Sequence, residues 1–386
     1  MKDYNTEEMA QQIMNMVQKE YKNLKKLNIM VLGKTGVGKS TLINNLFSEK
    51  IVDTGIGKPV TYQIRKIEKE GYPLALYDTP GLELNGENAV DNLLNQVKEE
   101  IKKGILTRDI GNAIHCICYC IAVPTHRFEQ AEIDFLREFL DETEEYHVPV
   151  IIVLTQAYNK RETRTLMQEI EKENLKIAKI VPILAEEYEI DDEYIAKSYG
   201  LDKLAEVMLQ IIPDAVKKTF IAIQSVNLNI KIERAQKIIG AAAAAAMATG
   251  ATPIPFSDAA LLIPEEIAML AKITATFGLP IGKGTLMTIV SSTIGATGAT
   301  ILGKSVVSSL LKIFAGPGTL VGGAISGAAA AALTAALGEA YAAILIQICK
   351  GDISMSELES EKGKKQVQAI FKEHLKMKRK KNGQLK

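Results

Sequence analysis

The sequence predicts an α/β fold with a doubly wound, mostly parallel six-stranded sheet, followed by an all-α C-terminal domain. Two observations predict it. Short apolar runs alternate with helical patterns in the first part of the chain, and the strand signal stops after about residue 216. Most of these runs are apolar on both faces, as is typical of strands covered by helices on each side. The expected strands lie at 27–33, 62–68, 72–78, 113–123, 148–155 and 178–185.

Helical patterns separate these strands and also precede them. An N-terminal helix is expected within 1–26, and the strands and their connecting helices predict a domain at 27–215. The connecting helices are expected at 39–48, 87–103, 129–142, 160–175 and 199–216. Three cysteines fall on one face of the fourth strand, where we expect buried free thiols rather than disulfides or metal ligands: Cys116, Cys118 and Cys120.

Small residues and few charges mark 216–350, which we expect to be a helical domain. Between Gln236 and Lys350, ten of 115 residues are charged, against 24% of the whole chain. Three uncharged runs are long enough to span a bilayer, but Ala, Gly, Thr and Ser outnumber bulky apolar residues in them. A soluble or reversibly membrane-associating domain and a set of constitutive spans therefore both stay open.

The last stretch, 351–386, is expected to form an amphipathic helix over 353–377 and a basic tail ending in "KMKRKKNGQLK". These charges would attract anionic lipid by ~1 kcal/mol each near a membrane surface, although a solvated tail is an equal alternative. Lys plus Arg equals Asp plus Glu over the chain, so net charge gives no general attraction to nucleic acid, which is not expected as a partner. The N-terminus, "MKDYNTEEMAQQ", is no secretory signal, and a reducing cytoplasm fits the cysteines.

The strongest motif is "GKTGVGKS" at 33–40, which satisfies G-x-x-x-x-G-K-[ST] between an expected strand and an expected helix. Such a loop closes backbone amides around phosphate oxygens at a helix N-terminus. Lys39 should reach the β- and γ-phosphates, and the Ser40 hydroxyl should bind Mg²⁺. The residues expected to bind nucleotide here are Gly33, Lys34, Thr35, Gly36, Val37, Gly38, Lys39, Ser40 and Thr41.

A second motif, "LALYDTPG" at 74–81, follows at the spacing that a phosphate loop requires. Asp78 ends an expected strand beside that loop, where a carboxylate can position Mg²⁺ through water. Gly81 can offer its amide to the γ-phosphate because no side chain stands in the way.

With these two motifs the chain resembles the translation-factor-related class of GTPases, and within it the Era-like branch. The segment "AAAAAAMATGATPIPFSDAALLIPEEIAMLAKI" resembles the conserved block of the YcjF-type tail domain, which follows an Era-like G domain in one bacterial group. The resemblance implies a P-loop G domain that binds GTP, GDP and Mg²⁺. It also implies that Thr61, rather than Thr54, closes over Mg²⁺ in the triphosphate state, so that Lys39, Thr61 and Gly81 are the expected catalytic residues.

Two positions depart from the usual pattern. Leu82 stands where many small GTPases place a glutamine that orients the attacking water, so we expect slow hydrolysis without a partner. In "TQAY" at 155–158, Tyr158 replaces the aspartate that reads guanine. Thr155 and Gln156 would still approach the base, and the resemblance implies that the Ala185 amide contacts guanine O6.

These observations predict a GTP-binding switch protein whose nucleotide state controls its helical tail. A nucleotide-gated membrane-remodelling or pore-like protein and a non-hydrolysing nucleotide-bound scaffold are the alternatives. The expected partners are guanine nucleotide, a second copy of the chain through the G domain, and an anionic membrane through the tail. The expected location is the cytoplasm, including a peripheral or integral position at the cytoplasmic membrane.

Overall fold

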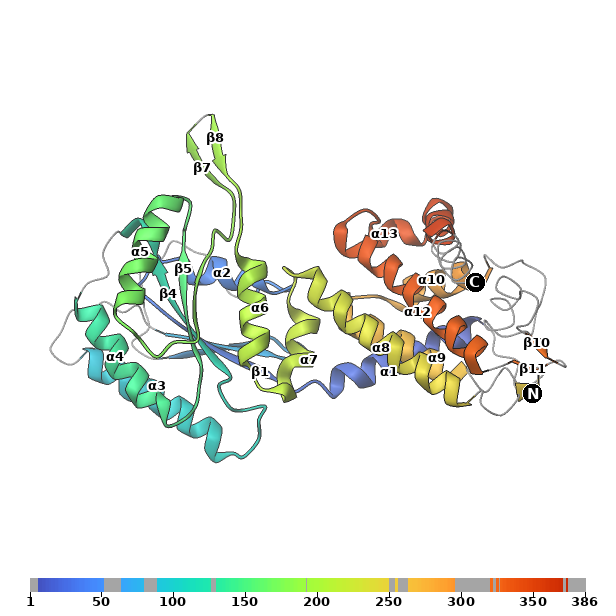
Figure 1. Cartoon of the computed structure of the whole chain (residues 1–386), viewed down its shortest axis with the longest axis horizontal. Helices are drawn as coiled ribbons and strands as arrows, with labels where there is room; N and C mark the ends of the chain where they lie inside the picture. The colour runs from blue at the N-terminus through green and yellow to red at the C-terminus, as the bar shows by residue number, and fades with distance from the viewer. Residues whose placement is uncertain are drawn as a thin grey trace. The chain divides into compact units, whose positions relative to one another are not determined.

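The structure is a computed structural model that describes residues 6–51, 64–79, 89–125, 130–191, 193–249, 254–255, 263–295, 320–321, 324–325, 327–370 and 373. The chain divides into two compact units (Figure 1). The first, Leu24–Asn227, is called the sheet unit below. The second combines Met1–Asn23 with Leu228–Lys386 and is called the helical unit.

The sheet unit contains a six-stranded sheet in the order β2-β3-β1-β4-β5-β6. All neighbouring strands are parallel except β2 and β3, which are antiparallel. The prediction of a mostly parallel six-stranded sheet is therefore confirmed. The strands are β1 (Leu27–Leu32), β2 (Arg65–Glu68), β3 (Leu74–Asp78), β4 (Cys116–Ala122), β5 (Val150–Thr155) and β6 (Lys179–Pro182).

Helices cover both faces of this sheet. The buried residues of α3, α4 and α5 share one apolar cluster with the sheet, whereas α7 contacts β1 and α6 contacts β6 and α2. The helices are α2 (Lys39–Leu46), α3 (Ala89–Leu106), α4 (Gln130–Glu144), α5 (Lys160–Lys172), α6 (Leu201–Ile211) and α7 (Asp214–Ile223), with a 3₁₀ turn at Val123–Thr125. The three strand cysteines are buried and free, as expected.

The expected helix at 199–216 is in fact two helices. Pro213 precedes α7 and has no backbone N–H to continue α6. The hydroxyl of Thr219 in α7 donates to the carbonyl of Lys25 at 2.6 Å, and the Phe220 ring packs edge-on against Phe47. The sheet unit therefore continues past the expected boundary at 215, to Asn227.

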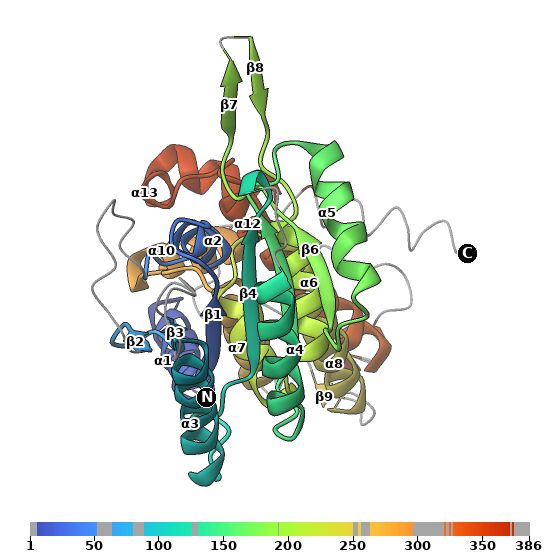
Figure 2. The ribbon, with the colours of Figure 1, turned by 90° about the vertical axis from the view of Figure 1, so that its left-hand side faces the viewer.

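A two-stranded hairpin between β6 and α6 was not predicted. It consists of β7 (Tyr188–Asp191) and β8 (Tyr194–Ala196), paired antiparallel, and it extends away from the sheet (Figures 1 and 2). Four of its large apolar side chains are exposed: Tyr188, Ile190, Tyr194 and Ile195.

The helical unit is built from long helices that pack through apolar faces. Helix α8 packs against α12 and α9, and α1 packs against α9 and α10. The N-terminal helix is thus part of this unit. Its elements are α1 (Thr6–Lys22), α8 (Leu228–Thr249), α9 (Ile263–Phe277), α10 (Lys283–Gly295), α12 (Gly327–Lys350) and α13 (Met355–Leu358), with two-residue strands β9 (Ile254–Pro255), β10 (Leu320–Val321) and β11 (Ala324–Ile325).

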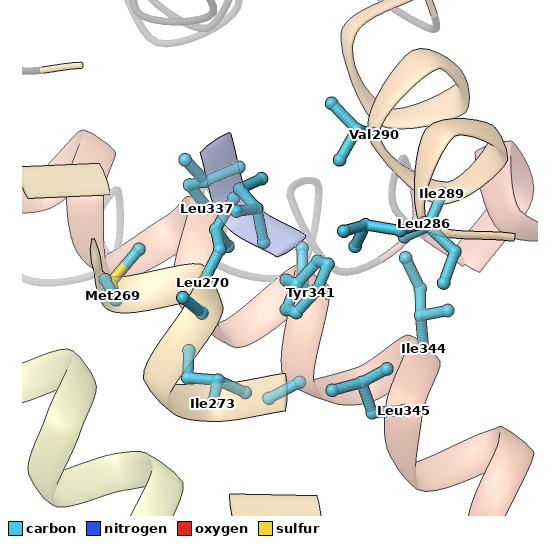
Figure 3. Close-up of a cluster of buried hydrophobic side chains, with 14 of the residues drawn as sticks. Met269, Leu270, Ile273, Leu286, Ile289, Val290, Leu337, Tyr341, Ile344 and Leu345 are labelled. Atoms are coloured by element: carbon cyan, nitrogen blue, oxygen red, sulfur yellow. The ribbon is translucent and has the colours of Figure 1, made fainter. Parts of the chain in front are cut away.

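The core of this unit lies between α9, α10 and α12, where Leu270, Leu286, Leu337 and Tyr341 are buried together (Figure 3). Gly338 allows the close approach of three helices. A Cβ atom there would lie 2.8 Å from Ile239 Cγ1 in α8 and 2.9 Å from Met269 Sδ in α9. A larger residue at 338 would therefore require Ile239 and Met269 to repack.

The C-terminal region departs from the single helix expected over 353–377. Helix α13 ends at Leu358, and residues 361–370 form a separate helical stretch after a break at Ser360, whose hydroxyl accepts from the Gly363 amide at 3.1 Å. One stretch of the described chain, Ala330–Lys350, is long and apolar enough to cross a bilayer. Because 59% of its most apolar window is buried inside the unit, it also matches a core helix.

Candidate functional site

The loop between β1 and α2 has a backbone that only glycine accommodates well. Gly33, Gly36 and Gly38 have φ of 142°, 79° and 91°. At Gly33 a Cβ atom would lie 2.4 Å from the carbonyl oxygen of Cys120, so a side chain cannot fit. No atom lies within 4 Å of a Cβ built at Gly36, so the crest of the loop is open.

Helix α2 starts directly after this loop. Its first helical hydrogen bond runs from the Leu42 amide to the Gly38 carbonyl at 2.9 Å. The amides of the first turn, at Lys39, Ser40 and Thr41, have no acceptor within a regular helix and carry the positive end of the helix dipole. Loop and helix start therefore form an anion-binding cradle, as predicted from the motif.

The Lys39 ammonium folds back over the same loop. Its Nζ donates to the Gly33 carbonyl at 2.8 Å and to the Lys34 carbonyl at 3.1 Å. Burial lowers the pKa of Lys39, and the negative charge of Asp78 opposes this shift. A phosphate in the cradle would offer the ammonium an anionic partner in place of two neutral carbonyls.

Asp78 ends β3 between two strands. It pairs in register with Val31 of β1 on one side and with Arg65 of β2 on the other. Burial raises the pKa of Asp78, and the charges of Lys39 and Arg65 oppose this shift. The next residue is fixed as well, because the Thr79 hydroxyl donates to the Val31 carbonyl at 3.2 Å.

The donor set fits Mg²⁺ bound together with phosphates. Ser40 and Asp78 supply one hydroxyl and one carboxylate, and Mg²⁺ in nucleotide sites typically takes one or two protein oxygens with phosphate and water. Within the described residues no three His, Cys, Asp or Glu side chains gather as an all-protein metal site. The cation would therefore depend on the nucleotide for most of its ligands.

Thr155 and Gln156 follow β5 and brace the phosphate loop. The Thr155 hydroxyl donates to the Val37 carbonyl at 2.5 Å, and the Gln156 side-chain amide donates to the Gly36 carbonyl at 3.0 Å. Gln156 has a φ of 52°, which is uncommon for a residue with a side chain. Both residues were expected to contact the base, and the structure shows them in contact with the loop.

Tyr158, at the position expected for the base-reading carboxylate, stacks on Tyr188 of the hairpin. The ring centroids are 4.5 Å apart and the planes differ by 10°. The backbone beneath is also fixed, because the Ala157 amide donates to the Ile183 carbonyl at 3.0 Å. Ala185, the residue expected to offer its amide to guanine, follows two residues later and is half-buried.

Two further residues of this site were not identified from the sequence. Tyr188 is the ring partner of Tyr158. Glu132 lies in α4 with a side chain 4% exposed, accepts from the Tyr119 hydroxyl at 3.0 Å, and forms an ion pair with Lys34 of the loop at 3.3 Å. A signal for Glu132 was present, because it occupies the apolar stripe of α4 together with Phe135 and Phe139.

Thr61 and Gly81, together with Thr54 and Leu82, lie outside the described residues. The roles assigned to them stay predictions. The structure thus brings together the loop 33–41, Asp78, Thr155 and Gln156, with Ala185 in the adjoining segment.

Comparison with known families gives two matches. Residues 23–203 match the family model described as Septin, and residues 216–380 match a domain of unknown function, DUF697. Septin-12 of Homo sapiens is 31% identical over 131 residues, covering 28% of this chain and 37% of the relative. Septin-1 of Drosophila melanogaster is 30% identical over 174 residues, covering 39% of this chain and 47% of the relative. The chain therefore spans less than half the length of these two relatives.

Solved structures give weaker likenesses. Era of Aquifex aeolicus, bound to GDP and AlF₄⁻, is 21% identical and covers 57% of this chain and 67% of Era, with a TM-score of 0.35. Toc33 of Arabidopsis thaliana, in complex with Mg²⁺ and GMPPNP, is 19% identical and covers 54% of this chain and 91% of Toc33, with a TM-score of 0.31. Scores this low carry no functional argument.

The family matches and the site geometry support the coarser part of the resemblance. The chain contains a P-loop G domain, over residues that are similar to the septin family model, followed by a helical region similar to DUF697. The narrower Era-like and YcjF-type resemblances stay expectations.

Proposed function

We propose that this protein is a GTP-binding switch with slow, Mg²⁺-dependent GTP hydrolysis, whose nucleotide state controls its helical unit. The observation that carries the proposal is the cradle at 33–41, with Lys39 folded over it and Asp78 at the adjoining strand end. The septin match over 23–203 supports the same reading.

Different residues of the site would bind the phosphates, hold Mg²⁺ and close around the triphosphate. Lys39 would exchange its hydrogen bonds to the Gly33 and Lys34 carbonyls for contacts with the β- and γ-phosphates. The amides of the loop and of the first turn of α2 would bind phosphate oxygens. Ser40 and Asp78 would hold Mg²⁺, which when bound would offset the charge of the phosphates. Thr61 and Gly81 would close around the triphosphate and release after hydrolysis.

Slow hydrolysis follows from Leu82. A leucine side chain neither donates nor accepts a hydrogen bond, so it cannot orient the attacking water. The missing group would come from another switch residue, a bound cation or a partner. A rate that rises with protein concentration would support a group supplied by a second copy.

Guanine selectivity in this proposal is weaker than that of a G domain with the usual aspartate. The phenol of Tyr158 is neutral, and its ring is held against Tyr188. The Ala185 amide would remain as a donor to guanine O6. Since a charged acceptor discriminates more strongly than a neutral one, we expect GTP to be preferred by a modest factor.

Nucleotide competition tests this assignment. In this assay GTP, ATP and XTP each compete with labelled GDP for the protein in the presence of Mg²⁺. Lys39→Ala is the control variant and should not bind the labelled GDP. Equal competition by ATP and GTP would remove the guanine assignment and leave the phosphate site intact. Single-turnover hydrolysis then separates a switch from a non-hydrolysing scaffold, which would show no rate above the Lys39→Ala control.

A G-domain dimer is part of the proposal, and the hairpin supports it. Tyr188 and Tyr194 lie on the same face of the hairpin, and they are 47% and 59% exposed. Tyr188 pairs with Ala196 across the hairpin, and Tyr194 lies two residues before Ala196 on the same strand. This face adjoins Tyr158 and hence the base end of the site. Analytical ultracentrifugation with GDP and with a non-hydrolysable GTP analogue would detect the dimer. A monomer with both nucleotides at high concentration would exclude it.

Association of the helical unit with a membrane at the cytoplasmic face is also proposed. The apolar stretch Ala330–Lys350 and the basic residues at 376–381 support it. Liposome flotation with GTP or GDP would separate nucleotide-controlled binding from constitutive membrane spans, which would float with either nucleotide. The absence of the protein from anionic liposomes with either nucleotide would leave a protein partner as the target of the unit.

A further inference from the structure

Three helices of the helical unit bring polar side chains to one end of the bundle. Thr249 is the last residue of α8, and its hydroxyl donates to Glu265 Oε1 in the first turn of α9 at 3.1 Å. The C-terminal end of α8 therefore lies beside the N-terminal end of α9.

Helix α12 runs in the same direction as α9. A Cβ atom at Gly338 would lie 2.9 Å from Met269 Sδ, and the Tyr341 and Thr274 hydroxyls are 2.7 Å apart, so residue numbers rise together along the two helices. Figure 3 shows Leu270 and Leu337 meeting on these turns. Thr334 precedes Gly338 by one turn, as Glu265 precedes Met269, so Thr334 lies level with the first turn of α9.

Apart from Glu265 Oε1, which accepts from Thr249, the side-chain oxygens of Glu265, Glu266 and Thr334 have no hydrogen-bond partner. Glu266 and Thr334 are each 1% exposed. Five buried side-chain atoms without a partner occur among the described residues, and four of them are here: Glu265 Oε2, Glu266 Oε1, Glu266 Oε2 and Thr334 Oγ1. Buried polar groups are rarely left unpaired, so this cluster calls for a ligand or a proton.

The chemistry of the cluster favours a cation. Both carboxylates stand in the first turn of α9, where the helix dipole offsets part of the cost of burying an ionised carboxylate. An ionised carboxylate buried without a countercharge is strongly unfavourable. We propose that Glu265, Glu266 and Thr334 bind a hard divalent cation, Ca²⁺ or Mg²⁺, which closes this end of the helical bundle.

The donor types fit that class of ion. Every available donor is oxygen, and the two free oxygens of Glu266 could bind one ion in the bidentate way that Ca²⁺ accepts. Two carboxylates would balance the charge of one divalent cation. The proton is the natural competitor, because burial and the charge of Glu265 raise the pKa of Glu266 to about 8.

Titration of the nucleotide-free full-length protein, after treatment with a chelator, tests the proposal. CaCl₂ and MgCl₂ are added separately, and thermal unfolding and calorimetric stoichiometry are measured. A cation that binds only the folded unit should raise its melting temperature by roughly 5–10 °C at a hundredfold excess over its Kd. Glu266→Gln should abolish the shift, whereas Glu233→Gln, an exposed glutamate of α8, should keep it.

The melting temperatures of the variants also test the proposal in chelator, without a cation. Because Glu266→Gln removes a buried charge at nearly constant shape, we expect it to fold and to melt higher than the wild type in chelator. Ser40→Ala should retain the shift, which separates this site from the nucleotide site. An unchanged shift in Glu266→Gln, or no shift of the wild type with either cation, would overturn the proposal.

Discussion

The two units of the molecule treat their buried polar groups differently. In the sheet unit most such groups are paired: His115 accepts from the Asn28 amide at 2.9 Å, and Glu132 accepts from the Tyr119 hydroxyl at 3.0 Å, while Asn28 Oδ1 has no partner. In the helical unit, Thr274 is paired with Tyr341, but Glu266 and Thr334 are equally buried and have unpaired oxygens. Among the described residues, unpaired buried oxygens therefore concentrate on α9 and α12, whereas in the sheet unit Glu132 is bonded beside the phosphate loop.

Glycine shows the same contrast. Gly33 and Gly36 adopt backbone conformations with positive φ that shape a cradle for phosphate. Gly338 lies within a helix and only makes room for Ile239 and Met269. Substitution at the first pair should therefore affect a ligand site, and substitution at Gly338 should affect packing. The predictions that follow probe this contrast.

At a single pH, the largest effect is expected at Gly33, where both stability and ligand binding should be lost. Gly33→Ala places a Cβ atom against the Cys120 carbonyl at a φ of 142°, and backbone cannot move aside as a flexible side chain can. We expect a loss of about 3 kcal/mol in the stability of the sheet unit, with loss of nucleotide binding. Gly71→Ala is the matched control, because φ is also positive there but no atom lies within 4 Å.

The control should lose about 1 kcal/mol and keep nucleotide binding. Denaturant unfolding and binding of labelled GDP measure the two properties separately. Equal losses in Gly33→Ala and Gly71→Ala would mean that backbone conformation alone, and not the contact with Cys120, makes glycine necessary.

Glu266 should make the helical unit less stable as the pH rises. Burial and the charge of Glu265 raise the pKa of Glu266 from 4.5 to about 8 in the folded state. Between these values the folded state binds more protons than the unfolded state. Stability is therefore fully present below about pH 4.5 and falls toward pH 8, by up to about 1.4 kcal/mol per pH unit.

Thermal unfolding of the wild type and of Glu266→Gln in chelator, from pH 5 to pH 8, measures this linkage. The difference between the two curves should widen with pH, and Glu233→Gln should follow the wild type. A constant difference would mean that Glu266 is ionised in the folded state across this range, as it is in the unfolded state, and the contrast between the units would then rest on packing alone.

Much of the sheet unit could be predicted from the sequence, because its signals are local. Six apolar runs gave six strands, and the Gly-rich loop between a strand and a helix gave the cradle with Lys39 and Ser40. The hairpin was not predicted although "YEID" alternates between large apolar and acidic residues. Its two strands are only four and three residues long and are separated by acidic residues, so they gave no apolar run of the length expected for a strand.

Contacts between distant residues were beyond reach of the sequence. Nothing in "TQAY" indicates that Tyr158 stacks on Tyr188, thirty positions later, or that Gln156 bonds to the phosphate loop. In the helical unit, Thr334 lies in a run of small residues and does not stand out in the sequence. Only the register of α9 and α12 shows which residues it lies beside. Small side chains specify close packing, but they do not specify which neighbours meet.

Packing at Gly338 should show a moderate effect. Gly338→Val inserts a branched side chain where a Cβ atom alone would meet Ile239 and Met269, so we expect a loss of about 1–3 kcal/mol in the helical unit. Gly240→Val in α8 is the matched control, since no atom lies within 4 Å there and valine improves on glycine in a helix by up to about 0.5 kcal/mol. Hydrogen exchange of α8, α9 and α12 would report both changes. Similar protection in the two variants would show that the helices can separate at little cost.

The smallest effect is expected at the stacked tyrosines, which link the hairpin to the base end of the nucleotide site. Tyr188→Ala removes a stack of about 1 kcal/mol and frees the Tyr158 ring. Because Tyr158 follows the residues that brace the phosphate loop, GTP affinity should fall about 2–5-fold, with a narrower preference over ATP. Ile195→Ala removes an exposed side chain that pairs with Glu189 rather than with Tyr188, so it should leave both quantities unchanged in dilute monomer. If Tyr158→Ala alters the preference but Tyr188→Ala does not, Tyr158 acts on the base by itself. The hairpin would then serve only the proposed dimer.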